Sequence, residues 1–382
     1  MRRFFASSTF ILFALSSSSV FALTIVSPTL QYDVCKRVSG GESPSDVYIA
    51  VMSPRGSPSP HIRSICDSGD RSHESVVVVK CEKPNADGED LVNEIEKTRI
   101  LSGAAPWSVN MVENFTLPPR GAGDRRLFQC YSMRVLGRSL REIREKSGKQ
   151  FDLPTLASIG LQMVRILKSL HNDFGLYHTD VHAANWLVRI DDPTKLALID
   201  YGYMVPLSGD PSDRIKELQE MIITLRWYTD LNDAWYVPKK ILRRYGEINL
   251  DMICPPATVP RELRGIIEYI MSLTPASFNP AEDYDLIAAM FTSILGVEDI
   301  EGVLWRDPKH TRLLHFAAAA ASSSAAAART SSVATTSPSL PRSHATPEPG
   351  EASAVAIALD QAEQAAIDAT VRASLQSLGL GL

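Results

Sequence analysis

The stretch HTDVHAANWLVRIDDPTKLALIDYG, from His178 to Gly202, decides the fold. Within it, two short apolar runs flank a polar turn around Pro193, a pattern that predicts two strands joined by a turn. Asp180 and Asn185 come just before the first predicted strand, and Asp200 comes just after the second. The stretch therefore places three side chains with oxygen ligands on one rim of a hairpin.

Oxygen ligands on one rim suit phosphoryl transfer from ATP, in which the protein mainly positions the reactants and neutralises charge. A carboxylate must orient the attacking hydroxyl, and an Asp/Asn pair must hold Mg²⁺ against the triphosphate. We predict Asp180 for the first task, and Asn185 with Asp200 for the second. A single D-x-x-x-x-N spacing also occurs in polar loops with a capping Asp, so the prediction depends on both motifs and on the rest of the chain.

The composition is that of a protein that is mostly globular. Hydrophobic residues make up 45% of the 382 residues and charged residues 22%. This length suits one large two-lobed domain, or two small domains, with additional tails. The net charge of −5 gives no sign of a nucleic-acid-binding surface.

The N-terminus has the pattern of a secretory signal. Two arginines at positions 2 and 3 precede an apolar segment at 10–15, and small or compact residues lead up to Ala22. The apolar segment is too short to span a bilayer, and no other segment offers an uninterrupted apolar span. We expect a signal peptide at 1–22 and a secreted, soluble mature protein without stable membrane insertion.

The five cysteines, Cys35, Cys66, Cys81, Cys130 and Cys254, all follow the predicted cleavage site. A secreted protein can form disulfides, but the number is odd and the spacings match no disulfide or metal framework. We expect at least one thiol to be free or paired between molecules. Cys81 and Cys130 lie in strand-like runs and are interpreted as core residues, while a bridge that involves Cys35 or Cys66 stays open.

A candidate phosphate loop lies near the start of the mature chain. Two strand-like runs flank a small-residue turn at 39–45, and glycine in such a turn lets backbone N–H groups approach a phosphate. If Val47 takes the valine position of G-x-G-x-x-G-x-V, only Gly40 matches a glycine of that motif. We assign Gly40, Gly41 and Val47 to nucleotide binding, and an ordinary hairpin is the alternative.

A lysine and an acidic helix follow in the order that a phosphate site requires. The run 76–81 is a buried-type strand that contains Lys80, and a helix is predicted from Asp87 to about Leu101 because acidic residues favour its positive end. Glu94 shares a helix face with apolar neighbours, so it should point inward and pair with Lys80. Glu96 is the alternative partner, and a solvated helix face that carries both is the simplest alternative.

The next segment carries a family resemblance. Val135-Leu136-Gly137-Arg138-Ser139-Leu140 follows a strand-like run that ends near Met133, and it is similar to the L-L-G-P-S-L hinge of the casein kinase 1 group, which includes the vaccinia-related kinases. The stretch from His178 to Gly202 resembles the catalytic loop and D-F-G motif of protein kinases. The resemblance implies an α+β, two-lobed protein kinase-like fold with a β-rich N-lobe and a mainly helical C-lobe. It also implies that Met133, Val135 and Leu136 contact the nucleotide.

Later motifs extend this resemblance to roughly residue 297. A long amphipathic helix is predicted over 153–171, Leu225-Arg226-Trp227 resembles the L-P-W of the group, and the run from Val259 to Phe291 resembles its C-lobe helices. After about residue 317, runs of Ala, Ser, Thr and Pro cannot form a core. The predicted domains are a signal peptide at 1–22, an N-lobe at 31–133 with a flexible insertion at 53–74, a C-lobe at 134–310, and a low-complexity, largely disordered tail at 317–382.

Three departures from the family affect the predicted function. Thr179 replaces the arginine that binds a phosphorylated activation loop in many kinases, and only residues 203–212 separate the metal motif from the next helix. Both features favour a constitutive geometry and remove the usual peptide-docking platform. His182 stands where Ser/Thr kinases place a lysine, and D-x-H-x-x-N resembles the loop of aminoglycoside and choline kinases, which phosphorylate small molecules. Because histidine titrates near neutrality, we expect His182 to support transfer best in a mildly acidic compartment.

The sequence thus predicts a secreted, atypical protein kinase that uses ATP and Mg²⁺ to phosphorylate a Ser/Thr hydroxyl. Lys80 would bind the α/β-phosphates, Glu94 would orient it, and Asp180 would act as the base. The alternatives are a weak or inactive pseudokinase that serves as a binding module, and a small-molecule hydroxyl kinase. The sequence also contains Asn114-Phe115-Thr116, an acceptor for N-glycosylation if it is exposed in a secreted protein.

Overall fold

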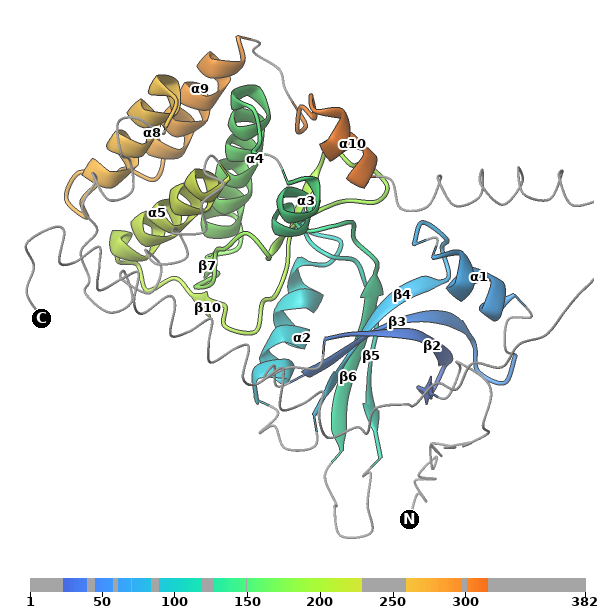
Figure 1. Ribbon diagram of the computed structural model, residues 1–382. Helices are drawn as coiled ribbons and strands as arrows, with labels where there is room; N and C mark the ends of the chain where they lie inside the picture. Colours follow the sequence, from blue (N-terminus) through green and yellow to red (C-terminus); the bar gives the residue numbers. More distant parts are fainter. Residues whose placement is uncertain are drawn as a thin grey trace, which may run out of the picture. The chain divides into compact units, whose positions relative to one another are not determined.

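The computed structural model combines an antiparallel sheet with helices that follow it along the chain (Figure 1). This mixed architecture is compatible with a kinase-like fold, and the division into two lobes stays a prediction. The predicted signal peptide, the predicted tail, and Gly40 and Gly41 lie outside the described residues. The structure describes residues 23–39, 45–57, 61–69, 71–83, 89–118, 127–148, 150–228, 259–296 and 301–314.

The sheet is built around β4, whose four consecutive valines favour a buried strand. Its order among the described residues is β1-β2-β3-β4-β6-β5, and every neighbouring pair is antiparallel. The predicted hairpin around the phosphate loop corresponds to β2 and β3. The strands are β1 (Thr24–Val26), β2 (Leu30–Ser39), β3 (Ser45–Pro54), β4 (Val76–Glu82), β5 (Met111–Leu117) and β6 (Phe128–Arg134).

The sheet curls until its two ends are bridged by side chains. Glu113 on β5 accepts hydrogen bonds from Ser27 and Thr29, in the turn between β1 and β2, at 2.7 and 2.5 Å. It also accepts one from the hydroxyl of Tyr32 on β2 at 2.8 Å. The ring of Tyr32 stacks on Phe115, with 5.4 Å between the ring centroids. These contacts enclose the hydrophobic core of the sheet.

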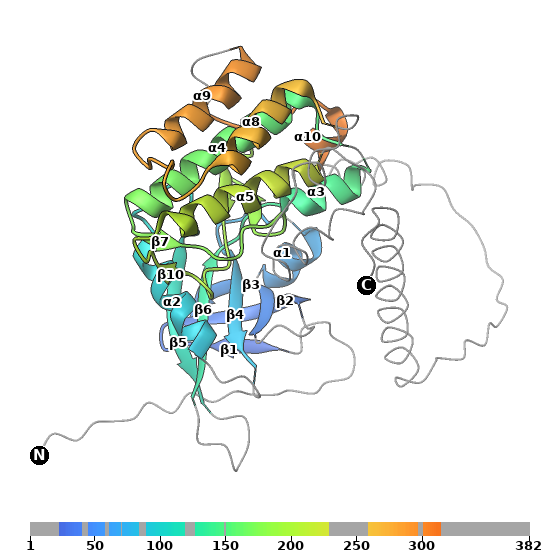
Figure 2. The ribbon, with the colours of Figure 1, turned by 90° about the vertical axis from the view of Figure 1, so that its left-hand side faces the viewer.

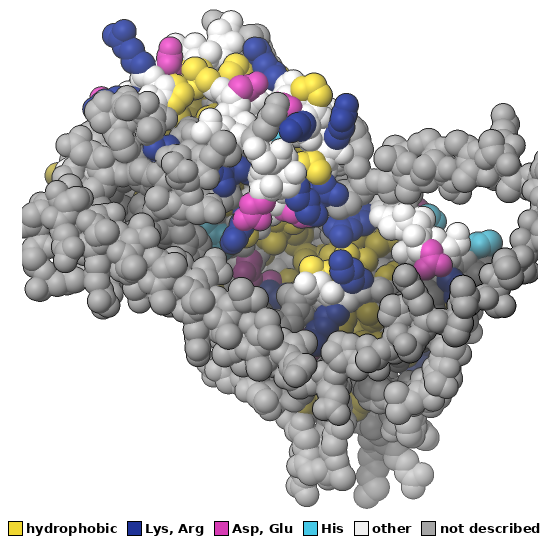
Figure 3. Space-filling view, viewed as in Figure 1, with side chains coloured by type: hydrophobic (Ala, Val, Ile, Leu, Met, Phe, Trp, Pro, Cys, Tyr) yellow, Lys and Arg dark blue, Asp and Glu magenta, His cyan; other side chains and the backbone are white. Residues whose placement is uncertain are grey.

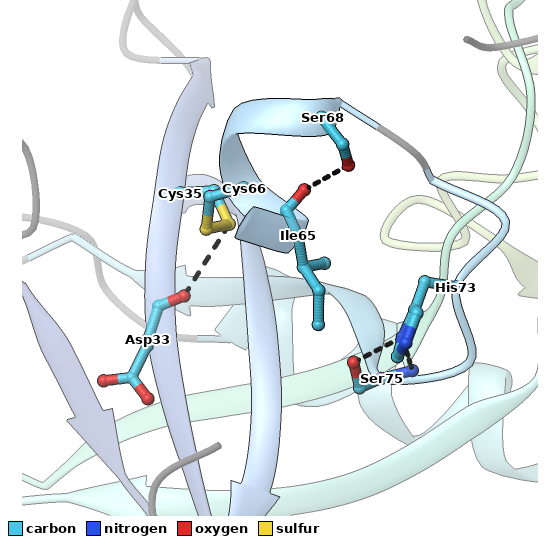
Figure 4. Close-up of a disulfide and its surroundings, with 7 residues drawn as sticks. All are labelled: Asp33, Cys35, Ile65, Cys66, Ser68, His73 and Ser75. Carbon is cyan, nitrogen blue, oxygen red and sulfur yellow. Dashed lines mark hydrogen bonds between the residues drawn. A yellow bond between two sulfur atoms is a disulfide. The ribbon is translucent and has the colours of Figure 1, made fainter. Parts of the chain in front are cut away.

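Two helices accompany the sheet. α2 (Glu89–Leu101) corresponds to the predicted acidic helix. The region predicted as a flexible insertion contains α1 (Ile62–Ser68), a short helix that the Ser- and Pro-rich composition did not indicate. A disulfide between Cys35 on β2 and Cys66 on α1 ties this helix to the sheet (Figure 4). The bridge that the sequence left open therefore joins these two cysteines.

A second disulfide lies inside the sheet. Cys81 on β4 and Cys130 on β6 are directly opposite each other in the strand register and are bonded. Both side chains are fully buried. Their interpretation as simple core residues is thus incomplete, because the strand-like pattern showed their burial but could not show that two strands distant in sequence are neighbours. The bond fixes the register of β4 against β6.

The helical part follows β6. Turned by 90°, the ribbon shows α4, α5, α8 and α9 grouped on one side and the sheet on the other (Figure 2). Among the described residues, no helix has the length and apolar character needed to cross a membrane. The helices are α3 (Leu140–Ser147), α4 (Leu153–Asn172), α5 (Pro211–Trp227), α8 (Arg261–Ser272), α9 (Asp283–Leu295) and α10 (Pro308–Leu314).

The central helix of this part is α4, which matches the predicted amphipathic helix. Asp152 caps its N-terminus by accepting a hydrogen bond from the Thr155 N–H at 2.8 Å, and Pro154 lies in its first turn. Gly160 allows α9 to approach closely, because a Cβ at this position would lie 2.4 Å from the ring of Phe291. The helix is buried along most of its length and supports the loop that follows it.

By contrast, α3 has a solvent-facing side with paired charges. Lys146 and Glu142 form an ion pair, and so do Arg141 and Glu145, each one helical turn apart. Figure 3 shows Lys, Arg, Asp and Glu side chains intermingled on the face that carries this helix. These exposed pairs make small contributions to stability and identify no binding surface.

Short strands surround the stretch that decides the fold. β8 (Trp186–Val188) and β9 (Leu196–Leu198) form an antiparallel hairpin, as the two apolar runs predicted. β7 (Leu176–Tyr177) precedes the loop, and it pairs with β10 (Val205–Pro206), which follows Gly202. The segment after Asp200 therefore returns at once to the strand before Asp180.

We expect the unfolded, non-reduced protein to expose one reactive thiol, because the two disulfides use four of the five cysteines. The remaining residue, Cys254, lies outside the described residues. Thiol titration in guanidinium chloride measures this count, and reduction should raise it to five. The Cys254→Ser variant should expose no thiol before reduction. If the wild-type protein exposes additional thiols before reduction, at least one of the two disulfides is wrong.

Candidate active site

Three charged side chains from distant parts of the chain meet beside the sheet. Lys80 on β4 donates from Nζ to Oε2 of Glu94 on α2 at 2.6 Å, and to Oδ1 of Asp200 after β9 at 3.2 Å. Glu94, rather than the alternative Glu96, is thus the residue next to Lys80. The contact joins the sheet, α2 and the hairpin in one place.

Burial makes this cluster electrostatically strong. The side chains of Lys80 and Glu94 are 14% and 6% exposed, whereas that of Asp200 is 42% exposed. Burial opposes the charge of Lys80, but Glu94 and Asp200 outweigh it, so the pKa of the lysine is raised. Burial also raises the pKa of Glu94, and the positive charge of Lys80 opposes this effect. Asp200 offers the most accessible carboxylate of the three.

The loop between β7 and β8 holds Asp180 by two neighbours. The amide nitrogen of Asn185 donates to the backbone oxygen of Asp180 at 3.0 Å and to its Oδ2 at 3.4 Å. Nε2 of His182 lies 3.2 Å from the same Oδ2. The N–H of Ala184 donates to Nδ1 of His182, so the neutral ring carries its proton on Nε2, toward Asp180. His182 therefore contacts the carboxylate that we predict as the base.

Asn185 and Asp200 fit the prediction of a Mg²⁺ site. The NH₂ group of Asn185 donates to Asp180, which leaves the amide oxygen of Asn185 for a cation. The backbone N–H of Ile199, the residue before Asp200, donates to the backbone oxygen of Asn185 at 3.0 Å. No group of three His, Cys, Asp or Glu side chains suited to a metal ion occurs in the described part of the chain. Mg²⁺ bound against a triphosphate needs only one or two protein oxygen ligands, because phosphates and water supply the rest.

Two residues at the site have a left-handed backbone, which non-glycine residues rarely adopt. They are Thr179, with φ of 65°, and Asp200, with φ of 69°. The N–H of Thr179 donates to Oε1 of Glu217 on α5 at 2.7 Å, and its hydroxyl donates to the backbone oxygen of Tyr203 at 2.9 Å. Thr179, which stands where many kinases have an arginine, thus ties the loop directly to the short segment after Gly202.

Glu217 also belongs to a buried chain of polar groups behind the loop. Its Oε2 lies 2.6 Å from Nε2 of His171 on α4, and Nδ1 of His171 is hydrogen-bonded to the hydroxyl of Tyr284 on α9. Burial raises the pKa of Glu217 to about 7 and lowers the pKa of His171 to about 3. Neither residue was identified from the sequence. A glutamate four residues before the buried Met221, on the apolar face of α5, was the available signal.

Tyr201, between Asp200 and Gly202, anchors the motif in the core. Its side chain is buried, and its hydroxyl donates to the backbone oxygen of Leu198 at 2.5 Å. The same hydroxyl is hydrogen-bonded to the side-chain hydroxyl of Ser108 at 3.1 Å. Because the ring is fixed inside, the preceding residue is held at the surface beside Lys80. Tyr201 therefore orients Asp200 although the segment that follows Gly202 is short.

Of the predicted nucleotide contacts, the structure describes Val47, Met133, Val135 and Leu136. Val47 on β3 lies directly opposite Lys80 in the register, and Met133 on β6 packs against Ile95 and Tyr131. Met133 and Leu136 are partly buried against the core of the helical part, and Val135 lies between them on the hinge. The hinge is fixed to β8, because the Gly137 N–H donates to the backbone oxygen of Val188 at 2.8 Å. A Cβ at Gly137 would lie 2.5 Å from the Val188 side chain, so glycine is required there.

Comparison with known proteins finds a partial likeness to a kinase. No protein-family model matches the chain. Over 141 residues, which are 36% of the chain, it is 27% identical to the casein kinase I homolog RAG8 of Kluyveromyces lactis. The match spans 24% of the length of that protein, so it concerns a part of each chain. The chain is similar to a kinase. This distant similarity agrees with the resemblance seen at the hinge and the catalytic loop.

The buried Glu217 carboxyl leads to a prediction about stability. Because its pKa in the folded protein, about 7, exceeds the ordinary value of 4.5, the folded state binds more protons between these pH values and its free energy of unfolding falls as pH rises. The Glu217→Gln side chain still accepts the Thr179 N–H. Relative to this variant, the free energy of unfolding of the wild type should fall by about 3 kcal/mol between about pH 4.5 and 7.

Denaturant unfolding of both proteins across this range measures the difference. Burial of His171 makes the free energy of unfolding rise with pH in both proteins, and the contact of His171 with Glu217 couples the two titrations, so the test is the sign of the difference between the two profiles. Glu145→Gln on the exposed side of α3 serves as the control and should follow the wild type. Parallel profiles for the wild type and Glu217→Gln would contradict the prediction.

Proposed function

We propose that this protein is an ATP-dependent phosphotransferase that transfers the γ-phosphate to a hydroxyl group. The observation that supports this most is the contact of Lys80 with both Glu94 and Asp200. A lysine held between two carboxylates keeps its charge and a fixed position, as a phosphate ligand must. The same arrangement would be costly as a purely structural feature, because burying the charges of Lys80 and Glu94 gains little stability.

The roles of the other residues follow from their geometry. Asp180 accepts the proton of the attacking hydroxyl. Asn185 holds the Asp180 carboxylate in place by hydrogen bonds to the backbone oxygen and to Oδ2 of Asp180. The Nε2–H of His182 points to the same carboxylate and limits its rotation. Lys80 binds the α/β-phosphates, while Val47, Met133, Val135 and Leu136 contact the nucleotide. The assignment of Gly40 and Gly41 to the nucleotide stays a prediction from the sequence.

Asp200 and the amide oxygen of Asn185 are the residues that would hold Mg²⁺. When bound, the ion neutralises the charge of the phosphate oxygens and orients them. The left-handed backbone at Asp200 and the buried Tyr201 keep the carboxylate of Asp200 turned toward Lys80. The protein's own contribution is therefore the placement of two oxygen ligands beside a fixed lysine.

We propose that the phosphate acceptor is a Ser/Thr hydroxyl of a protein. We also propose that the protein itself is secreted. The resemblance of the hinge and catalytic loop to the casein kinase 1 group supports the first. The signal pattern at 1–22 and the two disulfides support the second, because disulfides persist in oxidising compartments. A small-molecule hydroxyl is the second candidate, favoured by the contact between His182 and Asp180 and by the short segment after Gly202.

Turnover of ATP by the purified protein with Mg²⁺ tests the proposal. Asp180→Asn should lower the rate of phosphoryl transfer by about 10² or more, because the acceptor of the proton is lost. Asp191→Asn, a matched control, removes an exposed carboxylate at the other end of the same hairpin and should leave the rate unchanged. Equal, background rates in the wild type and Asp180→Asn would contradict the proposal. Stabilisation by ATP without turnover would instead indicate a pseudokinase.

A further inference from the structure

The carboxylate of Glu94 is held on both of its oxygens. Lys80 binds Oε2, and the hydroxyl of Tyr131 on β6 donates to Oε1 at 2.7 Å. Tyr131 is 1% exposed and Glu94 is 4% exposed, so this hydrogen bond is shielded from water. Farther along α2, the Thr98 hydroxyl donates to the backbone oxygen of Glu94. Glu94 is therefore fixed by a phenol as well as by an ammonium group.

The two donors have fixed positions relative to each other. Lys80 and Tyr131 are directly opposite in the register of β4 and β6, and their side chains therefore lie on the same face of the sheet. The next register pair is Cys81 and Cys130, which are joined by the disulfide. A covalent bond thus fixes the register that brings the ammonium group and the phenol to one carboxylate.

We propose that Tyr131 is a positioning residue that holds Glu94, and through it Lys80, in the geometry that binds nucleotide, with the Cys81–Cys130 disulfide fixing its register. The proposal rests on the proposed function for its catalytic consequence, but the coupling between the three side chains exists in the apoprotein. Tyr131 itself contacts no phosphate. It acts on the reaction by keeping α2 and its carboxylate in place.

Loss of this hydroxyl should have a recognisable effect on pH dependence. A hydrogen bond to the charged carboxylate lowers the pKa of Glu94, against the effect of burial. Its removal therefore raises that pKa, and the pair with Lys80 should be lost at a higher pH. In Tyr131→Phe, the acidic limb of the rate of phosphoryl transfer should move to higher pH, and kcat/KM for ATP should fall by about tenfold or more. Asp200, which faces Lys80, is unchanged in this comparison.

A matched control exists in the same sheet. Tyr32 on β2 is also buried, and its hydroxyl also donates to a glutamate, Glu113, at 2.8 Å. Glu113 lies near the turn between β1 and β2, and its hydrogen-bond partners in the described residues are Ser27, Thr29 and Tyr32 rather than Lys80. The Tyr32 hydroxyl is also hydrogen-bonded to that of Ser132 at 2.9 Å. Tyr32→Phe should lower stability much as Tyr131→Phe does, without a shift of the acidic limb.

The deciding experiment uses the apoprotein and two double-mutant cycles in unfolding free energy. The changes in unfolding free energy caused by Lys80→Met and Tyr131→Phe should be non-additive, because both substitutions remove a partner of Glu94. The changes caused by Lys80→Met and Tyr32→Phe should be additive. Additivity in the first cycle, or an unshifted acidic limb in an active Tyr131→Phe enzyme, overturns the positioning role. Non-additivity in a protein that turns over no ATP would support the contact and contradict the proposed function instead.

A separate observation concerns β5, one of the two edge strands of the sheet in the described residues. Phe115 and Leu117 point into the curled sheet and are buried, whereas Asn114 and Thr116 alternate with them and are exposed. Asn114-Phe115-Thr116 has the N-x-T pattern of an acceptor for N-linked glycans. Both residues that define the pattern therefore face outward, where an oligosaccharide fits without disturbing the core.

From this geometry we infer that Asn114 carries an N-linked oligosaccharide. The inference rests on secretion, which the signal pattern and the disulfides support independently of any activity. In the transfer, the amide nitrogen of Asn114 forms a bond to the first sugar of a lipid-diphosphate-linked oligosaccharide, and the lipid diphosphate and a proton leave. A glycan on β5 would also cover an open strand edge that could otherwise pair with another chain.

Secretion of the full chain from cultured eukaryotic cells tests this inference. A peptide-N-glycosidase, which hydrolyses the side-chain amide of a glycosylated Asn, should increase the electrophoretic mobility of the secreted wild type, and mass spectrometry should then find Asn114 converted to Asp. Asn114→Gln and Thr116→Ala should both lose the shift, while Thr116→Ser, which keeps the acceptor pattern, should retain it. An unmodified Asn114 in the secreted protein overturns the inference. Failure of the full chain, with its own N-terminal residues, to be secreted also overturns it.

Discussion

The rest of the structure depends on the ion pair between Lys80 and Glu94. A lysine on a buried strand is unfavourable unless a partner compensates its charge, and α2 supplies such a partner, Glu94, by lying against the sheet. Asp200 reaches the same ammonium group from the hairpin, so one buried charge links three elements. The sheet, α2 and the hairpin are thereby arranged around the place where a phosphate chain would lie.

Several features keep this arrangement rigid. The Cys81–Cys130 disulfide fixes β4 against β6, and Tyr201 anchors the hairpin end in the core. Behind the loop, Glu217 holds the strained Thr179, and Thr179 holds the short segment after Gly202 through Tyr203. Because these contacts already join the loop, the hairpin and the sheet, we expect the site to need no longer segment to become ordered. The constitutive geometry that the missing arginine and short segment indicated stays a prediction.

How much of this could be predicted depended on the range of the interaction. The β8–β9 hairpin, α4 and the inward direction of Glu94 follow from short periodic patterns, so the sequence indicated them. The Cys81–Cys130 pair, the Tyr131 hydroxyl on Glu94 and the chain from Thr179 to His171 depend on which distant strands and helices become neighbours. No local pattern contains that information. The helix α1 was missed for a different reason, because its composition is typical of loops and the disulfide that ties it to the sheet joins residues 31 positions apart.

The central claim is that Lys80, held by Glu94 and Asp200, forms a nucleotide-binding site. The most direct measurement is the dissociation constant of Mg²⁺·ATP, by calorimetric titration of the wild type, Lys80→Met and a surface control, Lys195→Met. The account predicts saturable binding by the wild type and the control, and affinity lower by about tenfold or more in Lys80→Met, because a charge-assisted bond to phosphate is lost. Equal affinity in all three proteins, or no binding by the wild type, would contradict it.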